Sequence, residues 1–334
     1  MIRTTAYRRS RLLAAAAVLP LLAGLAACSS AAADADKGSS DLQTNNAKAG
    51  LSVDTDAAQK DRPHTTQDPA AIALLPASFK DKDTLAVAVS AYVAPLAFLA
   101  DDDKTPIGNE PDIAQLVADA LGKKLDLEVT AWEDWPLALS SGKVDAVISN
   151  VTVTEERKET IDFSSYRNDQ LGWLAKVGNS KVPASITKPA DVAGLTVAVG
   201  SGTNQEKILL AWDKQNRAAG LKPVDIQYFQ NDPDTILALQ SGRIDLSFGP
   251  NATAAYKAKA DPALHVVGTL NGGWPDTAQI AVGTKKGNEL APAITEALNH
   301  AIADGSYAKV LDRWGLTAEG IAKSETNPHG LPKS

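Results

Sequence analysis

Two stretches of this chain have similar sequences and lie 100 residues apart. Residues 137–147 have the sequence LALSSGKVDAV, and residues 237–247 have LALQSGRIDLS. In each, a helix end is followed by a glycine suited to the left-handed cap position, a basic residue near the carbonyl-rich end, and a strand. The repeat predicts that one structural unit occurs twice, and hence that the chain has two similar lobes. The alternative is chance recurrence of a common helix-ending sequence.

Short apolar runs alternate with helix-like stretches around both copies of the repeat. This alternation predicts mainly parallel sheets flanked by helices, one sheet in each lobe, which is an α/β fold. A length of 334 residues suits about two domains. The predicted strands cover residues 85–89, 125–132, 144–148, 195–199 and 224–228, and the predicted helices cover 111–121, 135–141 and 205–212.

The first 27 residues have the pattern of an export signal. Four arginines precede an apolar stretch that ends in small residues, as in signal peptides. The run Leu25-Ala26-Ala27-Cys28 resembles the lipobox of bacterial lipoproteins, in which the cysteine is acylated once the preceding peptide is removed. We expect Cys28, the single cysteine of the chain, to be a lipid anchor rather than a buried or idle cysteine. The pair Arg8-Arg9 leaves general and twin-arginine export open.

Residues 28–82 differ in composition from residues 83–316. They are rich in Ala, Asp, Ser, Thr, Asn and Lys, with little apolar periodicity, which predicts a flexible tether between the lipid and the folded part. The whole chain carries a net charge of −7, which argues against nucleic acid as a partner. A negative protein is repelled by anionic lipid, so attachment to a membrane requires the covalent lipid. One cysteine supplies neither an intrachain disulfide nor a cysteine-based zinc site, and we expect no metal or cofactor.

Ligands of parallel α/β proteins bind beyond the carboxyl ends of the strands. In this sequence those positions carry small, polar or aromatic residues, which suit a small polar solute with one apolar part. In residues 200–204, Gly-Ser-Gly-Thr-Asn, the glycines let backbone amides point together at an anion, unless they only form the turn. The strand-end residues are Ser90-Ala91-Tyr92, Trp132, Ser149-Asn150-Val151-Thr152, residues 200–204 and Gly249-Pro250-Asn251.

Arg157 follows Thr154 by three residues, and Thr154 is suited to cap a helix that contains it. A guanidinium presents a planar fork that matches a carboxylate. From spacing alone, however, a surface ion pair with a nearby acid is favoured. Those acids are Glu155, Glu156 and Asp162.

Six segments, in an unbroken order over roughly residues 83–316, resemble the bacterial solute-binding protein family 3, the extracytoplasmic receptors of polar amino-acid ABC transporters. The stretch from residue 145 to residue 163 is the most specific. The six segments are TLAVAVSAYVAPLAF, IGNEPDIAQLVADALG, LALSSGKVDAVISNVTVTEERKETIDFS, LTVAVGSGTNQE, LALQSGRIDLSF and ADGSYAKVLDRWG.

The resemblance implies a two-lobed, type II periplasmic-binding-protein-like fold. Two crossover strands would join the lobes, near residues 166–171 and 275–281, and hinge closure would trap the ligand. Lobe one would comprise residues 83–167 and 279–325, lobe two residues 168–278, and residues 326–334 a polar tail.

The resemblance also implies contacts with the ligand. Arg157 matches the arginine that grips the α-carboxylate, and Thr203 and Asn204 match a lobe-two pair that reaches the same group. Trp132 matches a packing position, with a core tryptophan as the alternative. The small residues of lobe one that match ligand contacts are Ser149, Asn150 and Thr152.

This sequence departs from the family where the ligand amino group is held. Pro250 stands at the position of the family acid, and it has neither charge nor N–H. A further family acid aligns with Ser90, and a one-residue shift places Tyr92 at the family's loop aromatic. The substitutes for contacting a cationic or polar group are Ser90, Asn251 and Glu110, unless Glu110 is a solvated loop carboxylate.

The predicted function is therefore a membrane-tethered, monomeric receptor that closes on an amino acid or related carboxylated solute and delivers it to an ABC permease. One alternative is a dehydratase-like enzyme on the same fold. No nucleophile, base and orienting group stand at a suggestive spacing for it. The other is a ligand-sensing input protein, which would need a separate partner because no second apolar segment follows residue 314.

Overall fold

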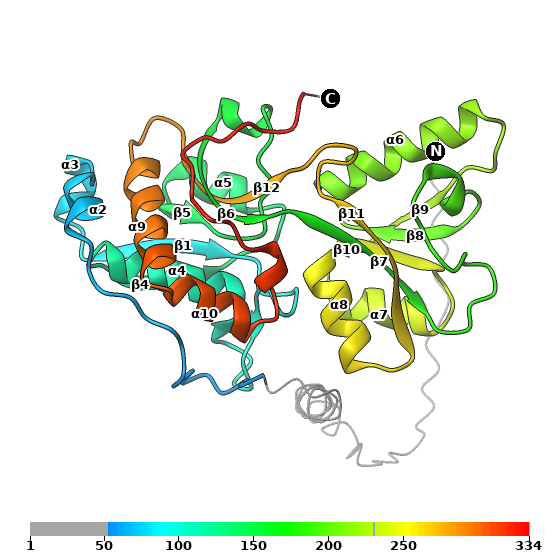
Figure 1. Ribbon diagram of the computed structural model, residues 1–334, viewed down its shortest axis with the longest axis horizontal. Helices are drawn as coiled ribbons and strands as arrows, with labels where there is room; N and C mark the ends of the chain where they lie inside the picture. Colours follow the sequence, from blue (N-terminus) through cyan, green and yellow to red (C-terminus); the bar gives the residue numbers. More distant parts are fainter. Residues whose placement is uncertain (1–52, 230, 334) are drawn as a thin grey trace, which may run out of the picture. The chain divides into compact units, whose positions relative to one another are not determined.

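The computed structural model describes residues 53–229 and 231–333, which form two α/β lobes (Figure 1). Cys28, the predicted signal peptide and the first part of the predicted tether lie outside these residues. Within the described part, no helix combines the length and the apolarity needed to cross a bilayer.

Lobe one is built on a five-stranded sheet in the order β4-β1-β5-β12-β6. Strand β1 pairs in parallel with β4 and β5, whereas β12 runs antiparallel to β5 and β6. Its elements are β1 (Thr84–Val89), β2 (Phe98–Leu99), β3 (Pro106–Ile107), α4 (Asn109–Ala120), β4 (Lys124–Val129), α5 (Trp135–Ser141), β5 (Ala146–Val147), η1 (Arg157–Glu159), β6 (Ile161–Asn168), β12 (Gln279–Lys285), α9 (Ala291–Ala303), α10 (Ser306–Arg313) and η3 (Thr317–Glu319).

Lobe two has the same arrangement, with its strands in the order β9-β8-β10-β7-β11. Strand β8 pairs in parallel with β9 and β10, and β7 runs antiparallel to β10 and β11. Its elements are β7 (Gln170–Lys176), η2 (Pro189–Val192), β8 (Thr196–Val199), α6 (Asn204–Ala218), β9 (Asp225–Tyr228), α7 (Asp232–Gln240), β10 (Leu246–Pro250), α8 (Asn251–Ala260) and β11 (Leu264–Asn271).

The sequence repeat corresponds to a structural repeat. Its first copy forms α5 and β5, and its second copy forms α7 and β10. Strands β5 and β10 occupy the same third place in their sheets. Both helices end before a glycine in the left-handed region, Gly142 at φ 77° and Gly242 at φ 75°, where other residues are strained.

The chain passes between the lobes twice, at Asp169 between β6 and β7 and between β11 and β12. The two crossings are bonded to each other: Asp169 N donates to Ala278 O at 2.9 Å, and Gly272 N donates to Asp169 O at 2.8 Å. In each sheet one crossing strand, β12 in lobe one and β7 in lobe two, runs antiparallel to its neighbours, and the other four strands run in one direction. The sheets are thus mainly parallel, as predicted, with one antiparallel strand each.

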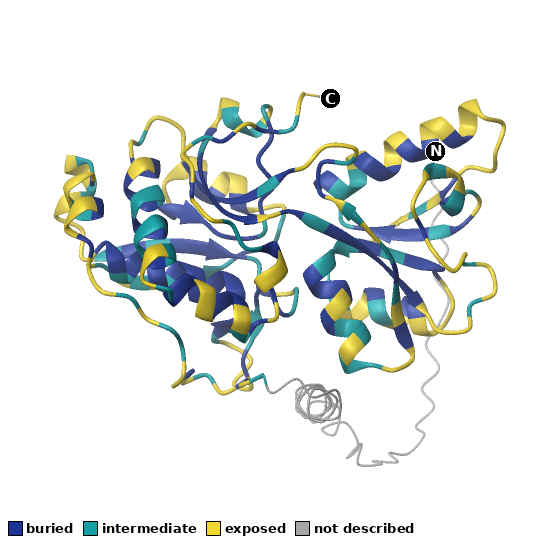
Figure 2. Cartoon of the chain, in the orientation of Figure 1, coloured by how far each residue is buried: buried dark blue, intermediate teal, exposed yellow. Residues whose placement is uncertain are grey.

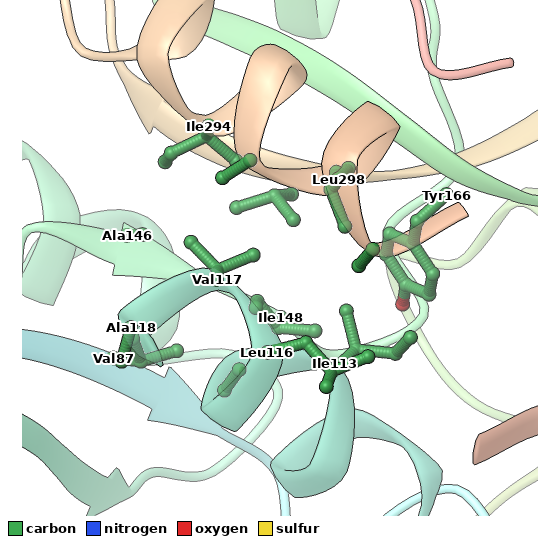
Figure 3. Close-up of a cluster of buried hydrophobic side chains, with 14 of the residues drawn as sticks. Val87, Ile113, Leu116, Val117, Ala118, Ala146, Ile148, Tyr166, Ile294 and Leu298 are labelled. Carbon is green, nitrogen blue, oxygen red and sulfur yellow. The ribbon is translucent and has the colours of Figure 1, made fainter. Parts of the chain in front are cut away.

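Each lobe has its own apolar core. In lobe one, Ile113, Leu116 and Val117 of α4 face Ile294 and Leu298 of α9 (Figure 3). In lobe two, aromatic rings stack at the centre, with Trp173 and Phe248 centroids 3.8 Å apart. The central strands of each sheet are largely buried, the edge strands β4 and β9 are partly exposed, and the outer faces of the helices are exposed (Figure 2). Burial of an Ile or Leu side chain contributes about 1.5–3 kcal/mol to stability.

Residues 53–82 pack on lobe one, and this corrects the prediction that the flexible tether extends to residue 82. Helix α2 (Pro69–Ala73), followed by α3 (Ala77–Lys80), is capped by Asp68 and packs against α9. Arg62 Nε donates to Asp112 Oδ1 of α4 at 2.8 Å, and Asp112 is fully buried. Apolar side chains, one buried ion pair and further hydrogen bonds, such as that from Asp68 N to Ala120 O at 2.9 Å, therefore hold a segment whose composition is typical of a linker.

The C-terminal residues also lie against lobe one. Asn327 N donates to Phe163 O at 2.8 Å, and Leu331 N donates to Val153 O at 3.0 Å. The predicted polar tail therefore forms an ordered border of lobe one up to residue 333.

Candidate ligand-binding site

A cavity of about 490 Å³ lies between the lobes, and residues of both lobes line it. This volume is within the range of small-molecule sites. The predicted contacts that line it are Ser90, Tyr92, Glu110, Trp132, Ser149, Asn150, Thr152, Arg157, Thr203 and Asn204.

Asn251 is the predicted contact that is absent from this lining. It begins α8, and its Oδ1 lies near Gly172 of β7, which itself lines the cavity. The neighbouring Pro250 lines the cavity in its place. Asn251 as a ligand contact stays a prediction that this lining does not support.

Arg157 reaches across the gap between the lobes. Thr154 Oγ1 accepts from Arg157 N at 3.0 Å, in a short 3-10 turn rather than the α-helix that the sequence predicts. Arg157 Nη1 donates to Thr152 O at 2.8 Å, and Nη2 donates to Gly202 O of lobe two at 3.3 Å. Burial lowers the pKa of Arg157, but arginine keeps its charge in proteins. A cation thus borders a largely apolar cavity.

The three acids near Arg157 in sequence pair with lysines instead. Lys158 Nζ lies 3.0 Å from Glu155, and Lys286 Nζ lies 3.5 Å from Asp162. Glu156 pairs across the gap with Lys207 of α6. The surface ion pair that spacing alone favours for Arg157 is therefore replaced by contacts within the cavity.

In the glycine-rich loop of lobe two, residues 200–204, some polar groups are already bonded to nearby groups of the same lobe. Gly202 N donates to Glu206 Oε2 at 2.6 Å, and Thr203 Oγ1 accepts from Glu206 N at 3.2 Å as the cap of α6. Asn204 Nδ2 donates to Gly272 O in the second crossing. The loop therefore joins the start of α6 to the hinge, and the Gly202 amide already has an anionic partner.

Ser90, Ser149 and Trp132 lie on the lobe-one side of the cavity. Ser90 N donates to Ser149 Oγ at 2.9 Å, while Ser90 Oγ is buried without a partner among the described residues. Trp132 packs edge-on against Trp135, with centroids 5.9 Å apart, and the Arg157 guanidinium carbon lies 5.8 Å from the Trp132 ring. Trp132 is half-buried, so one part packs in lobe one and another borders the cavity.

Glu110 is not a solvated loop carboxylate. It is 1% exposed at the start of α4, accepts from Tyr166 Oη, and lies 3.5 Å from Arg167 Nη2. Arg167 also contacts Asn150 Oδ1 and pairs with Glu319. Burial raises the pKa of Glu110, whereas the Arg167 charge lowers it. Glu110 and Asn150 thus share one buried arginine beneath the cavity.

Asp169 is a residue that the sequence analysis did not single out. It is 3% exposed at the first crossing, and its Oδ2 accepts from Thr152 Oγ1 at 2.7 Å. Burial raises the pKa of Asp169 to about 6. Asp169 and Arg167 both lie in the crossover strand predicted near residues 166–171. A charged side chain in a strand that joins two lobes was the available signal for both residues.

The cavity also contains lobe-two residues without any local sequence signal. They include Phe229, Asp232, Thr235, Thr253 and Lys257. In the described part of the chain, no cluster of three or more His, Cys, Asp and Glu side chains is arranged to hold a metal ion.

Comparison with known proteins assigns the family. The profile of the family described as bacterial extracellular solute-binding proteins, family 3, matches residues 85–317. The chain belongs to this family. Membership confirms the predicted extracytoplasmic solute-binding protein and favours it over a dehydratase-like enzyme.

Two curated relatives and one solved structure illustrate the similarity. The L-cystine-binding protein TcyJ of Escherichia coli (strain K12) is 32% identical over 238 residues, covering 70% of this chain and 84% of that protein. The arginine-binding protein ArgT of Corynebacterium glutamicum is 28% identical, covering 75% of this chain and 79% of ArgT. The solved structure of an ancestral arginine-binding protein bound to arginine is 31% identical in sequence, with a TM-score of 0.60. The similarity covers 70% of this chain and 98% of that chain. The predicted two-lobed fold is thereby confirmed.

Proposed function

We propose that this family 3 protein captures an amino acid in the cavity between its lobes and delivers it to the permease of an ABC importer. The observation that carries the proposal is the position of Arg157, which lines the cavity and contacts both lobes. Relatives whose names specify cystine or arginine as ligand support an amino acid.

The Arg157 guanidinium would hold the ligand carboxylate. In the described structure its N–H groups donate to carbonyl oxygens, and a carboxylate is a stronger, bidentate acceptor for the same fork. Thr152 O of lobe one accepts from Arg157 Nη1, and Thr203 of lobe two lines the same cavity. A carboxylate held by both lobes stabilises the closed arrangement. Binding would therefore increase the fraction of molecules in the closed conformation.

The amino group would be received on lobe one. Pro250 offers no charge and no N–H, whereas the buried Ser90 Oγ has no partner among the described residues and lines the cavity. Ser149 lies next to it. Trp132 would pack against the apolar part of the ligand, with Tyr92 exposed at the rim.

The lipid anchor is also proposed. Cys28 would carry the lipid after removal of residues 1–27, and the protein would act as a monomer at the outer face of the membrane. The reach from the lipid then depends on residues 28–52, because residues 53–82 pack on lobe one. We propose residues 83–167 and 279–325 as lobe one, extended by residues 53–82 and 326–333 that pack on it, and residues 168–278 as lobe two.

Isothermal titration calorimetry of the full-length protein against the common amino acids and L-cystine tests the proposal. At least one amino acid should bind, and Arg157→Ala should weaken its binding by about a hundredfold or more, because a partly buried charge pair is lost. Arg217→Ala is the matched control, since Arg217 is exposed on α6 and pairs with Asp213. Equal binding by Arg157→Ala and the wild type would refute the role of Arg157.

A further inference from the structure

The cavity extends over the sheet of lobe two. Helices α7 and α8 both pack on this sheet, and the strands beneath them contribute Leu174, Ala198 and Ser247 to the lining (Figure 1). Ala254 and Phe229 add further apolar surface. This part of the cavity is separate from the carboxylate site proposed around Arg157, since it is built from different strands and helices.

An ion pair faces this part of the cavity. Lys257 Nζ of α8 lies 2.6 Å from Asp232 Oδ1 at the start of α7, and both residues line the cavity. Their side chains are only 14% and 24% exposed. Partial burial takes both charges out of water, and their mutual attraction offsets this desolvation cost poorly. A contribution to stability therefore does not explain the pair. It offers one charge of each sign to a ligand.

A buried hydroxyl without a partner lies in the same region. Thr253 is 5% exposed on α8, lines the cavity, and its Oγ1 has no hydrogen-bond partner in residues 53–229 and 231–333. Buried polar atoms are nearly always bonded, and one that is not is a sign of a missing ligand or water. The hydroxyl is therefore a polar contact available to a bound molecule.

We propose that Asp232, Lys257 and Thr253 form a second head-group subsite, and that the preferred ligand carries two amino-acid head groups joined by a short apolar linker, as L-cystine does. This inference rests on the proposed function, because the first head group is held at Arg157. The ammonium of the second head group contacts the Asp232 carboxylate. Its carboxylate contacts the Lys257 ammonium and accepts from Thr253 Oγ1. Leu174, Ala198 and Phe229 surround the linker.

The charge balance of the subsite explains this preference. A ligand with a cationic side chain would be attracted to Asp232 but repelled by Lys257. A ligand with an anionic side chain would be attracted to Lys257 but repelled by Asp232. A head group with both charges satisfies the two residues at once. A purely apolar side chain would leave Thr253 Oγ1 without a partner.

Calorimetry of the full-length protein with two-headed and one-headed probes tests the subsite. The two-headed probes are L-cystine and L-cystathionine, and the one-headed probe is S-methyl-L-cysteine. We expect the wild type to bind a two-headed probe at least about tenfold more tightly. In Lys257→Met, Asp232→Asn and Thr253→Val, this affinity ratio should fall by about tenfold or more. Lys259→Met, an exposed neighbour on α8, should keep the wild-type ratio.

The outcomes separate the subsite from the receptor function. A wild type that binds S-methyl-L-cysteine as tightly as both two-headed probes overturns the subsite and leaves the receptor function standing. An unchanged ratio in Asp232→Asn and Thr253→Val, with thermal unfolding as in the wild type, also overturns the subsite. A wild type that binds no amino acid at all overturns the proposed function and the subsite together.

Discussion

Arg157 Nη2 of lobe one donates a hydrogen bond to the carbonyl oxygen of Gly202 in lobe two, at 3.3 Å. The residue that lines the cavity as a cation is thus also a contact between the lobes. Its second nitrogen, Nη1, is held by Thr152 O of its own lobe. A ligand carboxylate that takes over these donors would replace a direct contact between the lobes with a contact through the ligand.

Arg157→Lys should bind the ligand about tenfold more weakly than the wild type, and more tightly than Arg157→Ala. Lysine keeps the positive charge but lacks the planar fork that bonds both carboxylate oxygens. Calorimetry with the three proteins measures the order. If Arg157→Lys binds the ligand as tightly as the wild type, the positive charge alone accounts for the affinity and the bidentate contact is refuted.

Asp169 should make the protein less stable as the pH rises. Its pKa is raised to about 6 in the folded state, above the value of about 3.9 in an unfolded chain. The folded state therefore holds the proton more tightly, and this contribution is complete below about pH 4 and lost as the pH passes through about 6. In Asp169→Asn this pH-dependent loss of stability should be absent. As the pH rises from about 4 to above 6, the free energy of unfolding of the variant should therefore increase by about 3 kcal/mol relative to that of the wild type. Urea unfolding at a series of pH values measures both curves, and parallel curves would contradict the assignment.

The pair Glu156–Lys207 crosses the gap near Arg157 but should contribute little. Both side chains are largely exposed, at 58% and 44%. Exposed ion pairs are weak and screened by salt. Lys207→Ala should change ligand affinity by less than about threefold, and the change should vanish in about 1 M salt. A larger, salt-resistant loss in calorimetry would show that the pair controls closure.

Arg62 should help to hold residues 53–82 on lobe one. It donates to Asp112 Oδ1 at 2.8 Å, and Asp112 also accepts from Arg313 and Trp314. Arg62→Ala should speed hydrogen exchange in residues 53–82 by about tenfold or more, without altering ligand affinity, because one partner of a buried charge is removed. Lys60→Ala, an exposed residue two positions earlier, is the control. Equal rates of hydrogen exchange in residues 53–82 of both variants would show that the contacts of α2 suffice to hold this segment on lobe one.

Trp173 should be important for the stability of lobe two. It is fully buried, and its ring lies 3.8 Å from Phe248 and 5.5 Å from Trp212 between centroids. Trp173→Ala should destabilise the protein by about 3–5 kcal/mol, since a large cavity is left. Leu237→Ala, on the exposed face of α7, should cost less than about 0.5 kcal/mol. Urea unfolding compares the two, and similar losses would contradict the core assignment.

Local sequence patterns predicted much of the fold and of the cavity. The repeat at residues 137–147 and 237–247 was sufficient to predict two lobes, because a helix end, a left-handed glycine and a strand are coded by adjacent residues. Strand ends likewise pointed to Ser149, Thr152 and Thr203, which line the cavity. The direction of the crossing strands was not visible, since pairing partners lie more than a hundred residues apart.

By itself, the sequence determined what depends on neighbours along the chain: the lobes and the strand ends. Only the tertiary structure decided which distant groups meet. Asp232 pairs with Lys257, and Arg167 pairs with Glu110 and Glu319. The physical reason is that burial and charge pairing depend on distances in space, and those distances arise only when the sheets and helices have packed.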